Sequence, residues 1–487
     1  MTAAAGNTGE CNMQSAHQFY IDGQWQPARG GQVVSVLDPA SETPIGEVAC
    51  ATAAEVDLAV QAARRAFASF SRTPVEQRAL LLERIGAALR QRADEAAACV
   101  SAEMGAPLAF ARSFHVLGAA QRFEEMAGLV RGYAFEQPQG STLLVREAIG
   151  VCALIVPWNV PLVSLAGKLA AALAAGCTVV AKPSEVAPFS ALVLAEALHE
   201  AGVPPGVVNL LNGDGALTGT ALVEHPEVDM INFTGSTRAG VAIGKAAAES
   251  VKRVLLELGG KSPNLLLPGV DLEAVVPASV RRAYVGSGQS CQAPTRLLVH
   301  RAQAARAAEI AAATADAIVV GDPRDPTAEM GPLASAAQFD KVQALIGSGI
   351  EQGARLVAGG PGRPDGLARG LFVRPTVFAD VEPWMRIARE EIFGPVLSIL
   401  TYEEVEEAIE IANDTEYGLA AWVYGPESDA CRRIAGRLRA GRVYLNGAGP
   451  DPAAPFGGYK RSGNGREGGV HGLESHLELK AVMGWSG

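Results

Sequence analysis

The stretch GVCALIVPWNVPLVSLAGKLAAALAAGCTVVAKPSE, which spans residues 150–185, decides the fold. Val151–Val156 is a continuous apolar run, and Leu162–Ala175 has helical spacing and stops before Gly176, a residue suited to a helix C-cap. Thr178–Ala181 is a second apolar run. A buried strand, a helix and another buried strand are typical of a β-α-β unit, whose two strands lie parallel in one sheet.

The same alternation continues to residue 260. Three further apolar runs, separated by helical segments, are Val207–Leu211, Val228–Phe233 and Arg253–Leu256. Five such runs predict an α/β fold with a parallel sheet that is covered by helices on both faces. Ligands bind beyond the carboxyl ends of the strands in sheets of this kind, so we expect the functional site in the short segments that follow the runs.

Other elements flank this sheet. A second β-α series is expected at Pro263–Leu267, Leu297–His300, Ala304–Ala315 (a helix), Phe372–Phe378 and Val396–Leu400. Helices are expected over 55–70, 74–104 and 109–129. Phe19–Trp25 predicts a hairpin around an Asp-Gly turn, and Glu474–Met483 predicts a C-terminal strand. Residues 1–16 are small and polar, which predicts a disordered N-terminus.

Composition narrows the classes of function. Of 487 residues, 48% are apolar and 19% are charged, which excludes disorder as the main state. A net charge of −11 argues against a nucleic-acid binder and against binding to anionic membranes. The apolar stretch Leu169–Ala181 is too short to span a bilayer, and no signal peptide is visible. Seven cysteines without a Cys-x-x-Cys pair, and seven histidines without metal spacing, predict free thiols, no metal site and a cytoplasmic location.

Three segments after apolar runs carry candidate cofactor contacts. Gly213–Gly219 follows an apparent strand, and its Gly215 fits either close approach to a ligand or a tight turn. The hydroxyl of Ser236 and free N–H groups at a helix N-terminus suit a pyrophosphate, although an ordinary N-cap explains the serine equally well. Lys182 and Glu185 fit either the bracketing of a ribose or a solvated loop.

Three further residues carry candidate chemistry. The Asn159 amide could donate to a developing oxyanion or cap the helix that follows it. Cys291 lies in a glycine-rich segment that permits close approach to a ligand, and the alternative is a buried apolar thiol. Glu257, followed by two glycines within three residues, suits a general base or an ion-pair partner. Each residue taken alone leaves both explanations open.

Taken together, seven strings resemble the aldehyde dehydrogenase superfamily in their order and spacing, from about Phe19 to Met483. The strings are Pro157-Trp-Asn159, Lys182-Pro-Ser-Glu185, Phe233-Thr-Gly-Ser236, Glu257-Leu-Gly-Gly260, Gly288-Gln-Ser-Cys291, Glu391-Ile-Phe393-Gly-Pro395 and Pro455-Phe-Gly-Gly-Tyr-Lys460. The resemblance implies NAD(P)-dependent oxidation of a small-molecule aldehyde to a carboxylic acid.

The resemblance also implies three structural parts. One is a Rossmann-like parallel-sheet cofactor domain over residues 17–130 and 150–258. The second is an α/β catalytic domain over residues 259–471. The third is a small β oligomerisation element over residues 131–149 and 472–487, which implies self-association as a homodimer or homotetramer.

Roles are carried over from the resemblance residue by residue. Cys291 is the nucleophile, and its thiohemiacetal becomes a thioester when hydride leaves. The Asn159 amide and the Cys291 backbone N–H hold the oxyanion, Glu257 activates the hydrolytic water, and Lys168 with Glu467 match a proton path. The cofactor contacts are Pro157, Trp158, Lys182, Glu185, Gly215, Gly235, Ser236, Glu391 and Phe393. A carboxylate at Glu185 accepts from a ribose 2′-OH and repels a 2′-phosphate, which predicts NAD as the cofactor rather than NADP.

The resemblance places a substrate tunnel along the helix after Asn159. Its expected lining residues are Val160, Val163, Gly167, Ser290, Gln292 and Phe456. Gly167 supplies neither bulk nor charge, which predicts a roomy tunnel for bulky neutral aldehydes. The alternative is that Gly167 only permits close helix packing. The residues after Cys291, Gln-Ala-Pro-Thr-Arg, depart from the family pattern, and so does the segment 446–455. Both departures bear on the substrate more than on the chemistry.

Three alternatives remain at this point. Transfer of the thioester to coenzyme A needs no water-activating base, so Glu257 favours hydrolysis. A thiol esterase would need no dinucleotide. A non-enzymatic protein of the same fold would not be expected to keep Cys291, Glu257 and Asn159 together.

Overall fold

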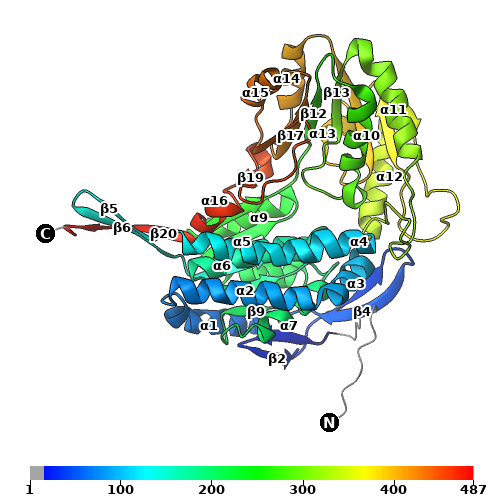
Figure 1. Cartoon of the computed structure of the whole chain (residues 1–487). Helices are drawn as coiled ribbons and strands as arrows, with labels where there is room; N and C mark the ends of the chain where they lie inside the picture. The colour runs from blue at the N-terminus through cyan, green and yellow to red at the C-terminus, as the bar shows by residue number, and fades with distance from the viewer. Residues whose placement is uncertain (1–15, 486–487) are drawn as a thin grey trace.

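The computed structural model describes residues 16–485, and an eight-stranded sheet forms its lower part in Figure 1. Its strand order is β19-β11-β10-β7-β8-β9-β1-β2. Five strands are mutually parallel: β7 (Val151–Ile155), β8 (Thr178–Lys182), β9 (Val208–Leu210), β10 (Met230–Thr234) and β11 (Arg253–Glu257). The chain moves outward from β7 to β9 and then returns to the other side of β7 for β10 and β11. This reversal is the switch point at which doubly wound sheets bind ligands.

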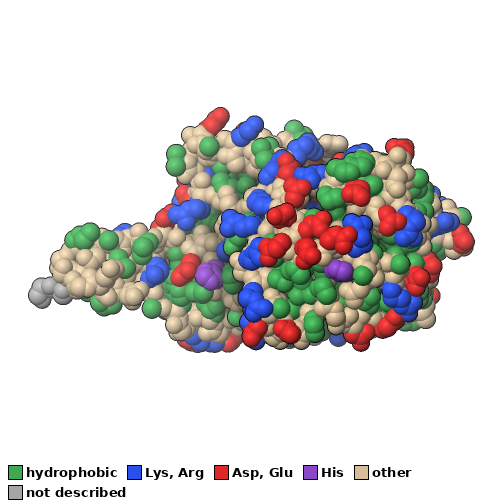
Figure 2. Space-filling model, turned by 90° about the horizontal axis from the view of Figure 1, so that it is seen from above, with side chains coloured by type: hydrophobic (Ala, Val, Ile, Leu, Met, Phe, Trp, Pro, Cys, Tyr) green, Lys and Arg blue, Asp and Glu red, His purple; other side chains and the backbone are tan. Residues whose placement is uncertain are grey.

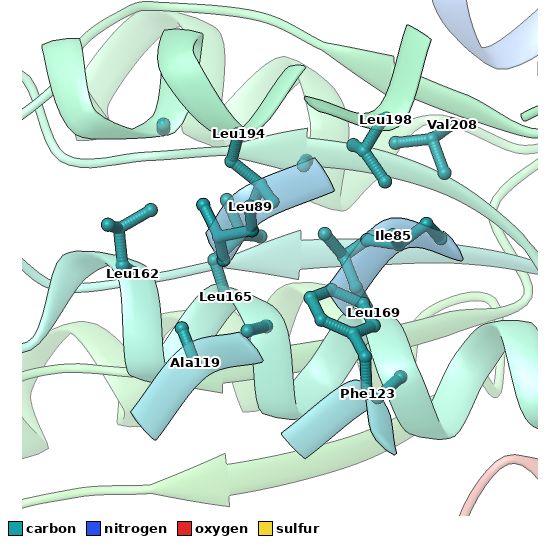
Figure 3. Packing of buried hydrophobic residues seen from close by; sticks show 14 of the residues in the cluster. Ile85, Leu89, Ala119, Phe123, Leu162, Leu165, Leu169, Leu194, Leu198 and Val208 are labelled. Atoms are coloured by element: carbon teal, nitrogen blue, oxygen red, sulfur yellow. The ribbon is translucent and has the colours of Figure 1, made fainter. Parts of the chain in front are cut away.

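Helices cover both faces of this sheet because side chains alternate along each buried strand. On one face, Cys152 and Leu154 of β7 join the core formed with α2 (Val75–Gln91), α5 (Gly118–Arg131), α6 (Pro161–Ala175) and α7 (Phe189–Glu200). Figure 3 shows Leu165 and Leu169 of α6 packed among Ile85, Leu89 and Phe123. On the other face, Val151 and Ala153 pack with α1 (Ala53–Phe70) and α9 (Thr237–Ala248).

A seven-stranded sheet forms the upper part of the molecule in Figure 1. In order across the sheet, the strands are β14 (Arg355–Ala358), β15 (Thr376–Ala379), β16 (Val396–Tyr402), β13 (Arg296–His300), β12 (Pro263–Leu266), β17 (Ala420–Tyr424) and β18 (Arg442–Leu445). All neighbours pair in parallel except β14 and β15. One face packs against α10 (Leu272–Ala283) and α11 (Ala304–Asp316). The other packs against α12 (Ala336–Glu351), α14 (Val405–Asn413) and α15 (Ser428–Ala435).

A three-stranded antiparallel sheet projects from the body as an arm (Figures 1 and 2). It pairs β20 (Leu477–Met483) with β6 (Thr142–Ala148), and β6 with β5 (Glu136–Gln139). The side chains of Leu479 and Met483 are 62% and 76% exposed. The arm therefore presents apolar side chains that the chain itself does not cover.

The remaining elements are short. They are β1 (Gln18–Ile21), β2 (Gln24–Pro27), β3 (Val33–Asp38), β4 (Thr43–Ala49), α3 (Ala93–Met104), α4 (Leu108–Phe110), α8 (Thr220–Glu224), α13 (Arg386–Arg389), β19 (Gly463–Asn464) and α16 (Gly469–Glu474). The pair β3-β4 forms a separate sheet, and β19 lies at the edge of the large sheet against β11.

The α/β fold is confirmed, and so is the Phe19–Trp25 hairpin, whose turn has positive φ at Asp22 (54°) and Gly23 (75°). One helix prediction is wrong in its extent. The helix expected over 74–104 breaks at Arg92, whose guanidinium pairs with three glutamates. The helix expected over 109–129 is confirmed, since helical residues run from Leu108 to Arg131, although Ala111–Leu117 within this stretch is π-helical.

Two strand predictions are also wrong at one end. The strand expected at Phe372–Phe378 starts only at Thr376, because Pro375 has no N–H to donate to a neighbouring strand. The strand expected from Glu474 starts at Leu477, after α16. Of the N-terminal segment predicted to be disordered, residues 1–15 lie outside the described residues, whereas Ala16 forms a β-bridge with Val48.

No helix within residues 16–485 is long and apolar enough to cross a membrane. Within the same residues no group of three or more side chains is arranged to hold a metal ion. Cys50, Cys152, Cys177, Cys291 and Cys431 are free thiols. Cys99 is disulfide-bonded, so the expectation of free thiols does not extend to it.

Candidate active site

The segments after the parallel strands bring the predicted catalytic residues to one edge of the large sheet. Asn159 follows β7 and is 7% exposed, and its Nδ2 donates to the backbone oxygen of Gln289 at 2.8 Å. Gln289 lies two residues before Cys291. Glu257 ends β11, and a Cβ on Gly260 would lie 2.2 Å from the carbonyl oxygen of Cys291. Glycine is therefore required at Gly260, where the Glu257 loop passes directly against Cys291.

The Glu257 carboxylate is buried, and neither of its oxygens has a hydrogen-bond partner within residues 16–485. Burial and the nearby Glu467 carboxylate raise the pKa of Glu257 well above its usual range, although Lys168 acts in the opposite direction. A Cβ on Gly457 would lie 2.5 Å from Glu257 Oε1, so the glycine-rich loop after Phe456 closes over this carboxylate. A carboxylate with a raised pKa and free oxygens suits a general base.

Cys291 is partly buried and lies five residues before β13, a central strand of the seven-stranded sheet. Burial raises the pKa of the Cys291 thiol, and the negative charges of Glu391 and Glu257 raise it further. The backbone N–H groups of Cys291 and Gln292 act in the opposite direction because they stabilise a thiolate. The thiol must therefore lose its proton before it can act as a nucleophile, and Glu257 is near enough to affect its charge.

Lys168 is buried in α6 and connects three parts of the chain. Its Nζ donates to Asn232 Oδ1 of β10 and to Glu467 Oε1 of the C-terminal segment. Glu467 is in turn held by two backbone hydrogen bonds of 2.7 Å to Phe456. Asn232 was not predicted from the sequence. Its signal was a polar residue between Ile231 and Phe233, in the buried part of the run Val228–Phe233.

The residues predicted to contact the ribose of the cofactor also lie together. Lys182 Nζ is buried, donates to the backbone oxygen of Gly213 at 2.6 Å and lies 3.6 Å from Glu185 Oε2. Burial lowers the pKa of Lys182. A Cβ on Gly215 would meet no atom within 4 Å, and its φ is not positive, so a tight turn does not explain this glycine.

A cleft of about 330 Å³ is formed by the start of α9, by α12 and α13, and by the loops that follow α13 and α14. It is lined by Ser236, Thr237, Arg238, Lys341, Arg389, Glu390, Glu391, Thr415, Glu416 and Tyr417. Ser236 caps α9, because its Oγ accepts from Ala239 N at 3.2 Å, as the ordinary N-cap explanation expects. The hydroxyl proton remains available, so capping does not exclude a ligand contact. Arg238 and Lys341, two positive charges in this cleft, were not predicted from the sequence.

Glu391 and Phe393 belong to the segment before β16 and contact Gly260 and Trp158, which follow strands of the large sheet. Glu391 Oε1 accepts from Gly260 N at 2.9 Å, and burial raises the pKa of this carboxyl group. Phe393 lies edge-on to Trp158, with ring centroids 5.5 Å apart and planes at 88°. Pro157 directly precedes Trp158. A Cβ on Gly235 would lie 2.4 Å from the Phe233 ring, so this turn admits only glycine.

The predicted tunnel residues come from α6 and two loops. Val160 is the N-cap residue of α6, and Val163 and Gly167 follow at helical spacing. A Cβ on Gly167 would meet no atom within 4 Å, so close helix packing does not require this glycine. Gln292 and Phe456 are linked through Tyr444 and Arg442. No hydrogen bond of the described residues connects the Ser290 side chain to this group.

The comparisons with known proteins identify the class. The model of the aldehyde dehydrogenase family matches residues 25–482, so the chain belongs to this family and is an oxidoreductase that acts on aldehydes. The predicted family is thereby confirmed, and a thiol esterase is not supported.

Individual relatives match over almost the whole chain. A 3-succinoylsemialdehyde-pyridine dehydrogenase from Pseudomonas sp. is 51% identical over 98% of this chain and 100% of that protein. The crystal structure of a mutant aldehyde dehydrogenase C from Pseudomonas syringae with NAD+ and octanal is 51% identical, with a TM-score of 0.96 over 97% of each chain. A Mycobacterium tuberculosis aldehyde dehydrogenase complexed with NAD+ is 40% identical, with a TM-score of 0.94 over 97% of this chain and 99% of that one.

Proposed function

We propose that the protein oxidises a bulky, uncharged aldehyde to the carboxylic acid with NAD as the electron acceptor. The observation that carries the proposal is the contact between three separate segments. Asn159 bonds to the loop of Cys291, Gly260 of the Glu257 loop lies against the Cys291 carbonyl, and the Glu257 carboxylate lies against Gly457 of the Phe456 loop. These contacts support a site in which nucleophile, oxyanion donor and base come together.

The chemistry follows from these groups. The Cys291 thiol loses its proton to solvent water, and the thiolate sulfur then bonds to the aldehyde carbon, whose carbonyl π bond opens to give the thiohemiacetal oxyanion. The Asn159 Nδ2 and the Cys291 backbone N–H stabilise the negative oxygen. NAD, when bound, supplies the acceptor for the hydride, which leaves a thioester on Cys291. Water then attacks the thioester while Glu257 takes its proton, and the carboxylic acid leaves as the thiol is restored. The Lys168–Glu467 pair offers the proton of Glu257 a route to solvent.

The residues of the cleft fit a dinucleotide. Arg238 and Lys341 supply positive charge, and the side chains of Ser236 and Thr237 line the same cleft. Ser236 and the N-terminus of α9 suit a pyrophosphate. Glu185 favours NAD over NADP, because its carboxylate would repel a 2′-phosphate.

The proposed substrate class depends on Gly167. The open space around its Cα and the apolar neighbours Val160 and Val163 favour a wide tunnel without a charge for a second carboxylate. The relative of known structure that carries octanal in its complex is consistent with a long apolar aldehyde.

We also propose the larger organisation. The segments 17–130 with 150–258, 259–471, and 131–149 with 472–487 act as cofactor, catalytic and oligomerisation parts. The exposed Leu479 and Met483 favour a homodimer or homotetramer that is joined through the arm. Introducing Leu479→Glu should lower the oligomeric mass in sedimentation velocity. A mass unchanged by this variant would place the interface elsewhere. The family and the five free thiols favour the cytoplasm, whereas the disulfide of Cys99 is unusual for that compartment.

The decisive experiment measures NADH absorbance with acetaldehyde, succinic semialdehyde, octanal and benzaldehyde. We expect octanal or benzaldehyde to have the highest kcat/KM, and the free acid to be the product with or without coenzyme A. A best rate with acetaldehyde or succinic semialdehyde would refute the substrate class. A product that becomes the coenzyme A thioester would refute hydrolysis.

A further inference from the structure

A chain of hydrogen bonds connects Arg442 and Tyr444 to Gln292, the residue that follows the nucleophile Cys291. It starts at Arg442 of β18, whose guanidinium carbon lies 4.9 Å from the centroid of the Phe456 ring. Arg442 Nε and Nη2 donate to the backbone oxygens of Pro455 (2.7 Å) and Ala454 (2.8 Å). The third nitrogen, Nη1, lies 3.5 Å from the Tyr444 hydroxyl oxygen. Because a guanidinium can only donate, that oxygen accepts from Arg442.

Tyr444 in turn orients the side-chain amide of Gln292. The Tyr444 ring is 7% exposed and stacks on Trp422, with centroids 4.8 Å apart and planes at 12°. Its hydroxyl lies 3.2 Å from Gln292 Oε1. Since the hydroxyl oxygen faces the cation, its proton points toward Gln292, where only the amide oxygen can accept it. This arrangement fixes the amide orientation and turns Nε2 away from Tyr444.

The Gln292 amide nitrogen is thereby left as a free donor on the residue next to the reacting cysteine in the sequence. Gln292 directly follows Cys291 and is partly exposed, and its Nε2 has no hydrogen-bond partner within residues 16–485. A donor held in one orientation discriminates between ligands, because a ligand that lacks an acceptor leaves the donor unpaired.

We propose that Gln292 recognises the substrate, and that the protein prefers aldehydes that carry a neutral hydrogen-bond acceptor, such as a ketone oxygen, a few atoms from the aldehyde carbon. The proposal rests on the function proposed above and refines its substrate class. Tyr444 and Arg442 act as positioning residues, because they orient the amide and do not themselves contact the substrate. A neutral hydrogen bond of ordinary strength corresponds to about threefold to tenfold in kcat/KM.

The test compares octanal with 4-oxooctanal and 5-oxooctanal, which match it in chain length and add one acceptor. The readout is the ratio of kcat/KM for each oxo-aldehyde to kcat/KM for octanal. We expect the better oxo-aldehyde to exceed octanal by about threefold to tenfold in the unmodified protein. Gln292→Met keeps the length of the side chain and removes the donor, so the ratio should fall toward one. Tyr444→Phe keeps the ring and frees the amide, so the ratio should fall part of the way.

Val163→Ala is the matched control, because it changes the volume of the predicted tunnel without changing a donor. It should move all rates and leave the ratio unchanged. A ratio at or below one in the unmodified protein overturns the proposal, and so does an unchanged ratio in Gln292→Met or Tyr444→Phe. These outcomes differ from failure of the proposed function, in which no aldehyde of the panel yields NADH.

Discussion

Replacing Gly167 with a large residue should lower kcat/KM for long aldehydes much more than for short ones. Gly167 lies in the middle of α6, and a Cβ there would meet no atom within 4 Å. The backbone can therefore carry a side chain without displacing a neighbour. Gly167→Ala should even stabilise the protein, since glycine in a helix interior costs about 1 kcal/mol relative to alanine. With an unfolding entropy of about 1 kcal/mol/K for a chain of this size, the melting temperature should rise by about 1 °C.

Gly167→Trp should instead fill the space that a long substrate occupies. If the indole displaces three methylene groups of octanal, the loss is about 2.4 kcal/mol, from about 0.8 kcal/mol for each buried methylene. That loss corresponds to about fiftyfold in kcat/KM. Acetaldehyde has no chain to displace, so its kcat/KM should change little.

The assay is NADH formation with octanal and acetaldehyde, measured alongside thermal melting. Gly128→Ala is the control, because a Cβ on Gly128 of α5 also meets no atom within 4 Å, and this residue lies outside the predicted site. It should raise the melting temperature and leave both rates unchanged. Octanal oxidation that survives in Gly167→Trp, or a parallel loss with both aldehydes, would refute a tunnel along this face of α6.

Three further predictions concern the catalytic pair Cys291 and Glu257, the ribose contact of Glu185, and the pH dependence of stability through Glu103. Cys291→Ala should abolish NADH formation, whereas Glu257→Gln should keep a first-turnover burst in stopped-flow absorbance and slow the steady rate. Because the pKa of Glu257 is raised, its basic form accumulates as the pH rises, so the steady rate should increase with pH. A Glu257→Gln variant with the unmodified steady rate would contradict its role as a base. Glu185→Gln should narrow the kcat/KM preference for NAD over NADP, and an unchanged ratio would argue against a ribose contact. Buried Glu103 accepts from backbone N–H groups at the start of α7 and from the Ser190 hydroxyl, and burial raises its pKa to about 7 from 4.5. The folded protein keeps a proton that the unfolded chain releases, so this contribution to stability is full below about pH 4.5 and lost as the pH rises through about 7. Glu103→Gln should remove that slope from the melting temperature, and an identical slope would show that another group causes it.

The large sheet could be predicted from the sequence because its strands are buried on both faces. Each strand is then an uninterrupted apolar run, and β7 and β8 end within one residue of their predicted limits. Helix limits were harder to predict, because distant contacts decide them. Arg92 ends α2 while it pairs with Glu196 and Glu200, more than a hundred residues away, and local spacing carries no sign of that contact.

The site shows the same division. Asn159, Ser236 and Glu257 could be predicted because each lies just beyond the end of a recognisable apolar run. Gln292 was predicted only as a tunnel residue, and its partner Tyr444 lies 152 positions further along the chain. A hydrogen bond between such residues depends on how two strands of a folded sheet are placed, which periodicity does not encode.

The pairing of Lys168 with Glu467 has a consequence for synthesis of the protein. The two residues are 299 positions apart, so a ribosome that adds about 5–20 residues per second makes the lysine about 15–60 s before its counter-ion. During that interval α6 can reach its final place only by burying an ammonium group whose one other hydrogen-bond partner within residues 16–485 is the Asn232 amide oxygen. The edge strand β19 is made equally late. A nascent chain of this protein is therefore exposed to chaperones and proteases until almost its last residues are made. A stop codon that removed only the final 25 residues would leave Lys168 of α6 without Glu467, its counter-ion.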